Sequence, residues 1–302
     1  MTSIRQEIRR LTMNGPAPFT AQVTVESVRS LSEGFRRVTV HGADLAAYTG
    51  IHPADAFKIM IPPDGRGAVD FPHRGDDGLP YWPDGARRPV LRAFTVRAFD
   101  PARRRLDFDV AVHGAGVTRT WLENACPGDV IGLSGMRREF AAGDVDRHVI
   151  IGDGSAVPAI AAIIESLDPD VPATVHVAVE HAADLTLLPR PPHVTVRPVH
   201  GSGAELATAV RAREEPDGRA QVWLAAEAAV VRDLRRHVLT ALGVARDDLH
   251  AAAYWKAGRD ATAVDDETLR AYQEAAASGA DVRDPDVADR IAFGEDEPGV
   301  PA

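Results

Sequence analysis

The sequence predicts two tandem domains, an antiparallel six-stranded β-barrel over residues 19–143 and a parallel α/β domain over residues 144–260. Short strand-like runs separated by turns fill the first part, which is typical of an antiparallel barrel. From about residue 143, strand-like runs alternate with helical ones, which indicates a parallel sheet. The length of 302 residues suits about two domains. Residues 1–18 are expected to form an N-terminal arm, and residues 261–302 a C-terminal helix and tail.

The composition is that of a globular protein with an acidic surface. Hydrophobic residues make up 45% of the chain, charged residues 26%, and the formal net charge is -10. A strongly negative chain is a poor partner for nucleic acid or for an anionic membrane. One cysteine, Cys126, excludes an internal disulfide and a multi-cysteine metal site. The sequence shows no secretory signal and no apolar run of roughly 20 residues, so we expect a cytoplasmic protein without membrane insertion.

The barrel strands are predicted from short alternating or apolar runs, and the connections from Pro, Gly and Asp. A long loop is expected over residues 62–89, which are rich in Pro, Gly, Asp and Arg. The predicted strands are residues 21–25, 36–40, 56–61, 91–97, 106–112 and 130–133.

The α/β domain is predicted from apolar strands that alternate with helical runs. Ser155 is expected to cap a helix over residues 156–167, with Pro158 tolerated in its first turn. An acidic helix start at residues 265–267 precedes a tail that we expect to be disordered. The other predicted helices are 203–213 and 228–242, and the predicted strands are 148–151, 174–179, 193–196, 221–226 and 249–255.

The strand over residues 91–97 carries the first candidate site. Alternate residues of a strand share a face, so Arg92 and Phe94 are expected to point the same way. An arginine offers a fork of donors for phosphate, and a phenyl ring offers a face for stacking. Thr95 offers a hydroxyl or its backbone N–H to a ring nitrogen, although strict alternation turns its side chain away. A dinucleotide flavin fits these groups, and the alternative is an ordinary half-buried strand.

Two glycine-containing turns are further candidates. Residues 113–116 precede a predicted helix over residues 117–124. Glycine lets the backbone approach a ligand closely, and the N–H groups at the start of a helix attract phosphate. Residues 152–158 follow a parallel-type strand and open a helix, where ligands of open α/β sheets bind. They do not match the G-x-G-x-x-G fingerprint. The alternatives are a strand-to-helix turn without ligand and a capped structural helix.

These segments occur in a definite order along the chain. They are Arg92-Ala93-Phe94-Thr95-Val96-Arg97, His113-Gly114-Ala115-Gly116, Gly152-Asp153-Gly154-Ser155-Ala156-Val157-Pro158-Ala159 and Tyr254-Trp255-Lys256-Ala257-Gly258. Together they resemble the siderophore-interacting protein family, flavin-dependent ferric-siderophore reductases of the ferredoxin–NADP reductase superfamily. The resemblance covers roughly residues 19 to 260. It implies that the barrel binds FAD and that the α/β domain binds NAD(P)H.

The resemblance implies a role for individual residues. Arg92 holds an FAD phosphate, Phe94 stacks on the flavin, and Thr95, the implied catalytic residue, sits near flavin N5. His113, Gly116 and Thr118 contact the pyrophosphate and adenosine side, whereas Asp153 and Ser155 belong to the nicotinamide-side loop. The full cofactor-binding set is Arg92, Ala93, Phe94, Thr95, His113, Gly116, Val117, Thr118, Asp153, Ser155, Ala156 and Glu227.

This chain departs from the family pattern at several of its positions. Phe94 replaces the usual Tyr, which removes one hydroxyl and keeps the ring. Val117 stands where Pro is usual, and Gly154 where Glu is usual, which changes the hydrogen bonding of that loop. Ala226 replaces Gly in the segment Ala226-Glu227-Ala228, where its methyl group leaves less room for a ligand to approach the backbone.

The family also holds anionic ferric siderophores with a basic triad. The matching residues are Lys58, Arg137 and Lys256, with Arg138 and Arg259 as neighbours. The alternative is that these are ordinary surface charges. His176, His181, His193 and His200 lack paired ligand spacing, so we expect no protein metal site and iron that arrives and leaves with its siderophore.

The resemblance implies a ferric-siderophore reductase that moves electrons from NAD(P)H through FAD to Fe(III), releasing Fe(II). Its expected partners are an anionic ferric siderophore and, as a further electron donor, ferredoxin; we expect a monomer. One alternative is a general NAD(P)H- or ferredoxin-dependent flavin reductase on the same scaffold. The other is a siderophore-binding protein without redox activity.

Overall fold

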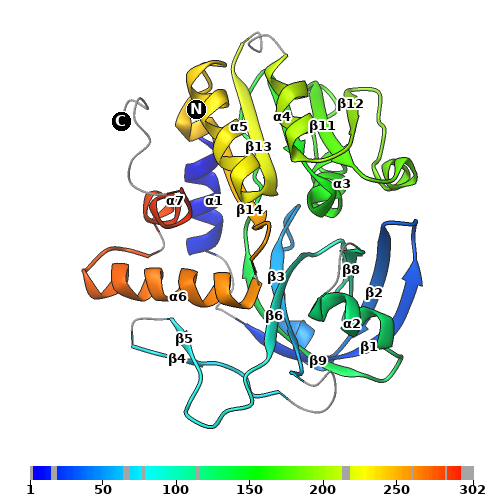
Figure 1. Cartoon of the computed structure of the whole chain (residues 1–302), viewed down its shortest axis with the longest axis vertical. Coiled ribbons are helices and arrows are strands. Elements are labelled where there is room, and N and C mark those ends of the chain that lie inside the picture. Colours follow the sequence, from blue (N-terminus) through cyan, green and yellow to red (C-terminus); the bar gives the residue numbers. More distant parts are fainter. Residues whose placement is uncertain are drawn as a thin grey trace. The chain divides into compact units, whose positions relative to one another are not determined.

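The computed structural model describes residues 3–14, 19–63, 69–76, 79–112, 116–212, 218–259, 261–282 and 284–293. The chain divides into two compact units (Figure 1). The barrel unit is Asn14–Arg138, and the α/β unit is Met1–Met13 together with Glu139–Ala302. The α/β unit therefore includes the start of the chain.

The barrel unit is built around one antiparallel sheet with the strand order β6-β3-β9-β1-β2-β8-β7. Its two edge strands, β6 and β7, are neighbours in the chain, separated only by Val96 and Arg97. The Val96 N–H donates to Asp55 O at 2.7 Å, and the Arg97 N–H donates to Asp107 O at 2.8 Å. The strands are β1 (Thr20–Ser30), β2 (Phe35–His41), β3 (Ala56–Ile61), β6 (Val90–Thr95), β7 (Ala98–Asp100), β8 (Arg105–Ala111) and β9 (Val130–Arg137).

One bent stretch of chain therefore supplies both edges of the sheet. Because β6 bonds β3 while β7 bonds β8, this stretch links the two ends of the curled sheet. The predicted antiparallel barrel class is confirmed as a curled antiparallel sheet of seven strands instead of six. The predicted strand 91–97 corresponds to β6, and β7 was not predicted.

The segment predicted as a long loop contains structure of its own. It forms a short hairpin from β4 (His73–Arg74) and β5 (Pro80–Tyr81). Asp70 and Arg87 tie its two ends together, because the Arg87 N–H donates to Asp70 Oδ2 at 2.7 Å and the Asp70 N–H donates to Arg87 O at 3.3 Å. Composition could not show this, since the tie joins residues far apart in the segment.

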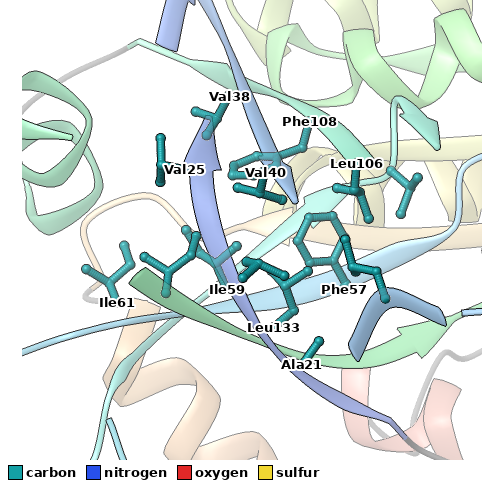
Figure 2. Close-up of a cluster of buried hydrophobic side chains, with 14 of the residues drawn as sticks. Ala21, Val25, Val38, Val40, Phe57, Ile59, Ile61, Leu106, Phe108 and Leu133 are labelled. Atoms are coloured by element: carbon teal, nitrogen blue, oxygen red, sulfur yellow. The ribbon is translucent and has the colours of Figure 1, made fainter. Parts of the chain in front are cut away.

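The barrel core consists of side chains that alternate inward along each strand (Figure 2). Phe57, Ile59 and Ile61 of β3 are buried there, and Phe108 of β8 packs edge-on against Phe57 with ring centroids 5.5 Å apart. The period of two residues in β3 thus determines which of its faces points outward.

A buried ionic group anchors the start of β3 and the end of β9. Asp55 is fully buried and forms an ion pair with Arg138, which is 5% exposed. Asp55 Oδ2 also accepts hydrogen bonds from the Tyr48 hydroxyl at 2.7 Å and the His52 N–H at 2.9 Å. Burial, reinforced by the Asp55 carboxylate, raises the pKa of Tyr48 far above its ordinary value. We call Tyr48, Asp55 and Arg138 the buried triad.

The α/β unit contains a parallel five-stranded sheet with the strand order β12-β11-β10-β13-β14, which confirms the predicted class. Helices connect β10 to β11, β12 to β13 and β13 to β14, whereas a 3-10 segment (Ala182–Leu187) lies between β11 and β12 (Figure 1). The elements are β10 (Arg147–Gly152), α3 (Val157–Ile164), β11 (Ala173–Val179), β12 (Val194–His200), α4 (Gly203–Arg211), β13 (Ala220–Glu227), α5 (Ala228–Thr240) and β14 (Leu249–Trp255).

The N-terminal helix α1 (Ile4–Met13) and the C-terminal helix α7 (Pro285–Phe293) lie side by side (Figure 1), and ion pairs join them. The Arg5 guanidinium lies 2.6 Å from Asp289 and 2.9 Å from Asp286. Arg235 of α5 lies 3.6 Å from Asp289, and its guanidinium stands 5.0 Å from the Phe293 ring centroid. Part of the tail expected to be disordered is therefore a docked helix, because long-range ion pairs offset the cost of ordering it.

The helix α6 (Ala261–Ala277) begins before the acidic run at which a helix start was predicted. Within the part of the chain that the structure describes, no helix is long and apolar enough to cross a membrane.

A buried histidine predicts a pH-dependent stability of the α/β unit. Burial lowers the pKa of His148, at the start of β10, to about 4 from an ordinary value of 6.5. Between these values the unfolded chain binds a proton that the folded chain does not, so the free energy of unfolding should rise with pH by up to about 3 kcal/mol. Urea denaturation at a series of pH values measures this slope. His148→Leu should flatten it, whereas replacing exposed His41 by Leu should not; an unchanged slope in His148→Leu would contradict the assignment.

Candidate active site

The outer face of three neighbouring strands, β6, β3 and β9, carries several of the predicted site residues. Directly opposed residues of antiparallel strands share a face. Thr95 lies opposite Ala56, which in turn lies opposite Arg137. In the next row, Ala93 lies opposite Lys58. Thr95, Ala93, Lys58 and Arg137 therefore lie on one face of the barrel wall, although they come from three separate parts of the chain.

A β-bulge brings Arg137 onto this face. Between Ala56 and Lys58 of β3 there is one intervening residue, whereas the partners on β9, Arg137 and Ser134, are separated by two. Gly135 lies in the bulge with φ 69, a left-handed conformation that glycine adopts without strain. Without the extra residue, a simple alternation would turn Arg137 to the other face.

Arg92 and Phe94 point to the opposite side of β6, as alternation predicts. They lie opposite Ile59 and Phe57, two residues of the barrel core. Both side chains are only partly buried, and Phe94 packs on Phe108 with ring centroids 5.3 Å apart. Thr95, on the other side, is 5% exposed. Thr95 therefore needs a local twist of β6 for its hydroxyl to contact the flavin ring, and this twist remains a prediction. The cofactor roles of Arg92, Phe94 and Thr95 also remain predictions.

Aromatic packing ties helix α2 (Val117–Asn124) to this strand. Trp121 of α2 stacks on Phe108 with ring centroids 6.5 Å apart, and Phe108 also contacts Phe94. The predicted limits of this helix are confirmed. Through Phe108, the fold therefore connects the predicted flavin strand with the predicted pyrophosphate helix.

The start of α2 suits a bound phosphate. Its N-cap is Gly116, with φ 146, a residue that has no side chain with which to cap the helix. Helix geometry leaves the first N–H groups, including those of Val117 and Thr118, without partners inside the helix, and these groups attract phosphate. Val117 is exposed here. The predicted contact residue His113 lies outside the described residues. The uncapped helix start, the Arg92 guanidinium and the half-exposed Phe94 ring fit the phosphates and flat ring of FAD.

At the carboxyl ends of the parallel strands, Asp153 organises the other candidate region. Its Oδ1 accepts hydrogen bonds from the Ser155 N–H at 2.9 Å and the Ser155 hydroxyl at 2.5 Å. Its Oδ2 accepts from the Glu227 N–H and from Trp255 Nε1, both at 2.9 Å. Asp153 is 8% exposed. The ends of β10, β13 and β14 therefore meet at one carboxylate.

Ser155 was predicted to cap the helix, and the structure corrects this. Asp153 is the N-cap of a short 3-10 turn, Gly154–Ala156, and Ser155 donates to it. The helix α3 follows with Ala156, which is fully buried, at its N-cap position. An aspartate accepts hydrogen bonds without donating any, so it displaces the serine from the capping role.

Glu227 supports a second set of contacts at the same edge. Its Oε2 caps helix α5 by accepting from the Ala229 N–H at 2.6 Å and the Val230 N–H at 3.3 Å. Its Oε1 accepts from the Ala257 N–H at 3.1 Å. The segment that carries Lys256 is thereby attached to the end of β13.

The three cations proposed for an anionic substrate and their two basic neighbours in the sequence have different environments. Lys58 and Arg137 share the outer face of the barrel, and Lys256 is exposed in the α/β unit directly after β14. Arg138 is buried in its pair with Asp55, so it is unsuited to bind a substrate. Arg259 pairs with Glu267 of α6. Sequence proximity alone had grouped Arg138 and Arg259 with the others.

Two residues, one in each unit, were given no role by the sequence. Trp255 belongs to a quoted motif, but its bond to Asp153 joins positions 102 residues apart. Asp55 precedes a strand without any motif, and its partner Arg138 is 83 residues away. Among the described residues, no group of His, Cys, Asp and Glu side chains could hold a metal ion.

Comparison with known proteins places these features in a family. The model of the Siderophore-interacting FAD-binding domain matches residues 24–140, and that of the Siderophore-interacting protein matches residues 145–258. The ferric vibriobactin reductase ViuB of Vibrio cholerae serotype O1 is 30% identical over 245 residues, which cover 78% of this chain and 89% of ViuB.

Two solved structures agree with this assignment. A siderophore utilization protein from T. fusca has 29% identity and a TM-score of 0.72, with 82% of this chain and 95% of that chain covered. The siderophore-interacting protein SipS from Aeromonas hydrophila has 28% identity and a TM-score of 0.69, with coverages of 87% and 99%. The chain therefore belongs to the siderophore-interacting protein family, and its barrel unit is the FAD-binding domain of that family.

Proposed function

We propose that this protein is an oxidoreductase that reduces siderophore-bound Fe(III) with electrons from NAD(P)H, using FAD. The register of β6, β3 and β9 carries the proposal, because it sets two cations, Lys58 and Arg137, on the same face as the predicted catalytic residue Thr95. Family membership and the likeness to a relative named as a ferric vibriobactin reductase support it.

The protein contributes binding and electrostatics. Arg92 and the start of α2 would hold the phosphates of FAD, and Phe94 would support its ring system. When bound, FAD supplies the conversion of a two-electron donor into one-electron steps. Lys58 and Arg137 attract an anionic iron complex to the barrel wall, against a formal net charge of -10 that otherwise repels it. Siderophore-bound ferric iron is the substrate, and Fe(II) binds hard oxygen ligands less tightly than Fe(III) does.

For the donor we propose NAD(P)H bound at the carboxyl edge of the parallel sheet, where open α/β sheets bind ligands. Gly154 and Ala226 lie at this edge, in place of the family's usual Glu and Gly. If ferredoxin were the donor instead, reduction would depend on neither NADH nor NADPH. The expected cytoplasmic location and monomeric state remain predictions.

The proposal is tested by an absorbance scan of the purified protein, followed by anaerobic titration. NADH or NADPH should bleach the flavin spectrum, and a ferric siderophore should restore it, with a ferrous chelator trapping the product. A colourless protein that takes up no FAD would refute the proposal. Bound FAD that bleaches and does not return with the ferric complex would indicate a general flavin reductase.

The triple variant with Lys58, Arg137 and Lys256 changed to Ala should bind anionic ferric siderophores more weakly. We expect KM for a tris(catecholate) complex of Fe(III) to rise at least about tenfold, and KM for a neutral tris(hydroxamate) complex to change little. A matched triple variant at Arg10, Arg103 and Arg211 loses the same charge from exposed surface pairs and should behave like the wild type. Unchanged turnover of both complexes in the first variant would favour the general flavin reductase.

A further inference from the structure

Lys256 is held between two hydrogen bonds that come from other strands. On one side, Trp255 Nε1 donates to Asp153 Oδ2 at 2.9 Å. On the other, the Ala257 N–H donates to Glu227 Oε1 at 3.1 Å. Asp153 follows β10 and Glu227 ends β13, and β10, β13 and β14 are neighbours in the sheet. Trp255, before Lys256, is thus fixed to the end of β10, and Ala257, after Lys256, is fixed to the end of β13.

Both carboxylates are occupied by the protein's own donors. A carboxylate has about four lone-pair sites, and Asp153 accepts four hydrogen bonds from Ser155, Glu227 and Trp255. Glu227 accepts three, from the N–H groups of Ala229, Val230 and Ala257. The protein's own N–H and O–H groups therefore use most of the hydrogen-bond acceptor sites of Asp153 and Glu227, and few sites are left for a bound molecule. This arrangement favours a structural action on neighbouring residues over direct contact with a nicotinamide.

Besides these two anchors, the ion pair of Arg259 with Glu267 of α6 also restrains the segment. Residues 255–259 are exposed, and the Trp255 side chain itself is 44% exposed. Gly258 follows with φ 68, and the Arg259 N–H closes the turn on Lys256 O at 3.3 Å. Exposed backbone at a strand end opens easily, and a lysine on a mobile backbone loses entropy when it binds an anion. Two anchors on either side of Lys256 reduce this cost.

We infer that Asp153 and Glu227 are positioning residues for Lys256, and that Trp255 transmits the effect of Asp153 through its indole N–H. The inference rests on the proposed function, in which Lys256 contacts an anionic ferric siderophore. It assigns the two acidic residues of the nicotinamide-side edge to recognition of the iron complex. Substrate affinity should then depend on Asp153 and Glu227 only while Lys256 is present.

The test compares Trp255→Phe and Asp153→Asn with the wild type, each alone and combined with Lys256→Ala. Trp255→Phe keeps an aromatic ring and removes the donor, so it tests the bond even if Asp153→Asn folds poorly. We expect KM for the trianionic tris(catecholate) complex of Fe(III) to rise roughly three- to tenfold in both variants. Trp255→Phe should leave KM for NAD(P)H and for a neutral tris(hydroxamate) complex unchanged. In the Lys256→Ala background the same changes should add nothing.

A matched control is Asp248→Asn. Asp248 is 5% exposed, lies at the opposite end of β14, and accepts hydrogen bonds from Arg219 at 2.7 and 2.8 Å. It should affect stability and leave KM for the iron complex unchanged. A rise in KM for NAD(P)H in Trp255→Phe, or an effect of Trp255→Phe on KM for the iron complex that persists without Lys256, would overturn the inference.

Amide hydrogen exchange tests the anchors without any activity measurement. The Ala257 amide should be protected in the wild type and exchange at least about tenfold faster in Glu227→Gln, whose single carbonyl oxygen cannot serve both α5 and Ala257. Equal exchange in the two proteins would overturn the inference. A wild-type protein that protects Ala257 but does not reduce ferric complexes would instead refute the proposed function, so the two failures are distinguishable.

Discussion

Arg92→Ala should yield a protein that folds normally and loses FAD during purification. Arg92 lies on β6 and is expected to donate hydrogen bonds to an FAD phosphate. Hydrogen bonds to a charged group contribute about 1.5–3 kcal/mol. The dissociation constant for FAD should therefore rise roughly 10- to 100-fold. The ratio of flavin to protein absorbance in the purified protein, followed by titration with FAD, measures the effect.

Two further variants control this result. Arg92→Lys keeps the charge and loses the fork of donors, so it should retain FAD at an intermediate level. Arg103→Ala removes an arginine from an exposed turn of the same unit, where its guanidinium lies 3.6 Å from Asp100, and should retain FAD fully. If Arg92→Ala retained FAD as the wild type does, with circular dichroism unchanged, the assignment of the phosphate site to β6 would be wrong.

Asp55→Ala should destabilise the barrel unit more than any surface change. Removing this carboxylate leaves the buried guanidinium of Arg138 without its counter-charge and the Tyr48 hydroxyl without its acceptor. Breaking a buried ion pair on one side costs about 3–5 kcal/mol, a large part of the about 5–15 kcal/mol by which a domain is stable. Native-state hydrogen exchange of the barrel strands measures the loss separately from the α/β unit.

The comparison for Asp55→Ala is Asp100→Ala, whose partner Arg103 is exposed. That change should alter the free energy of unfolding by less than about 1 kcal/mol. A double variant, Asp55→Leu with Arg138→Met, removes both charges and should recover much of the stability lost by the single change. Similar small losses for Asp55→Ala and Asp100→Ala would mean that the buried triad does not stabilise the barrel.

The helix α2 and the strand β14 illustrate what could be predicted locally. Their limits, Val117–Asn124 and Leu249–Trp255, agree with those predicted. Glycine before a helical run, and an apolar strand before a polar turn, are signals carried by neighbouring residues. The hairpin of β4 and β5 shows the opposite case, because its closing contacts between Asp70 and Arg87 have no local signature.

The substrate residues divide in the same way. Lys58, Arg137, Arg138 and Arg259 all read as basic residues in the sequence, and nothing local distinguishes them. The fold buries Arg138 against Asp55, pairs Arg259 with Glu267, and uses the bulge at Gly135 to turn Arg137 outward beside Lys58. A one-residue change of register would reverse the last of these outcomes.

By itself, the sequence determined the two domains, their order and the segments that carry the chemistry, because periodicity, turns and motifs are properties of adjacent residues. Only the tertiary structure decided that β6 and β7 lie at the two ends of the curled sheet, that Thr95, Lys58 and Arg137 share a face, and that Asp153 and Glu227 anchor the residues around Lys256. These outcomes depend on pairing register and on hydrogen bonds between positions far apart in the chain, which are settled only when the whole sheet packs.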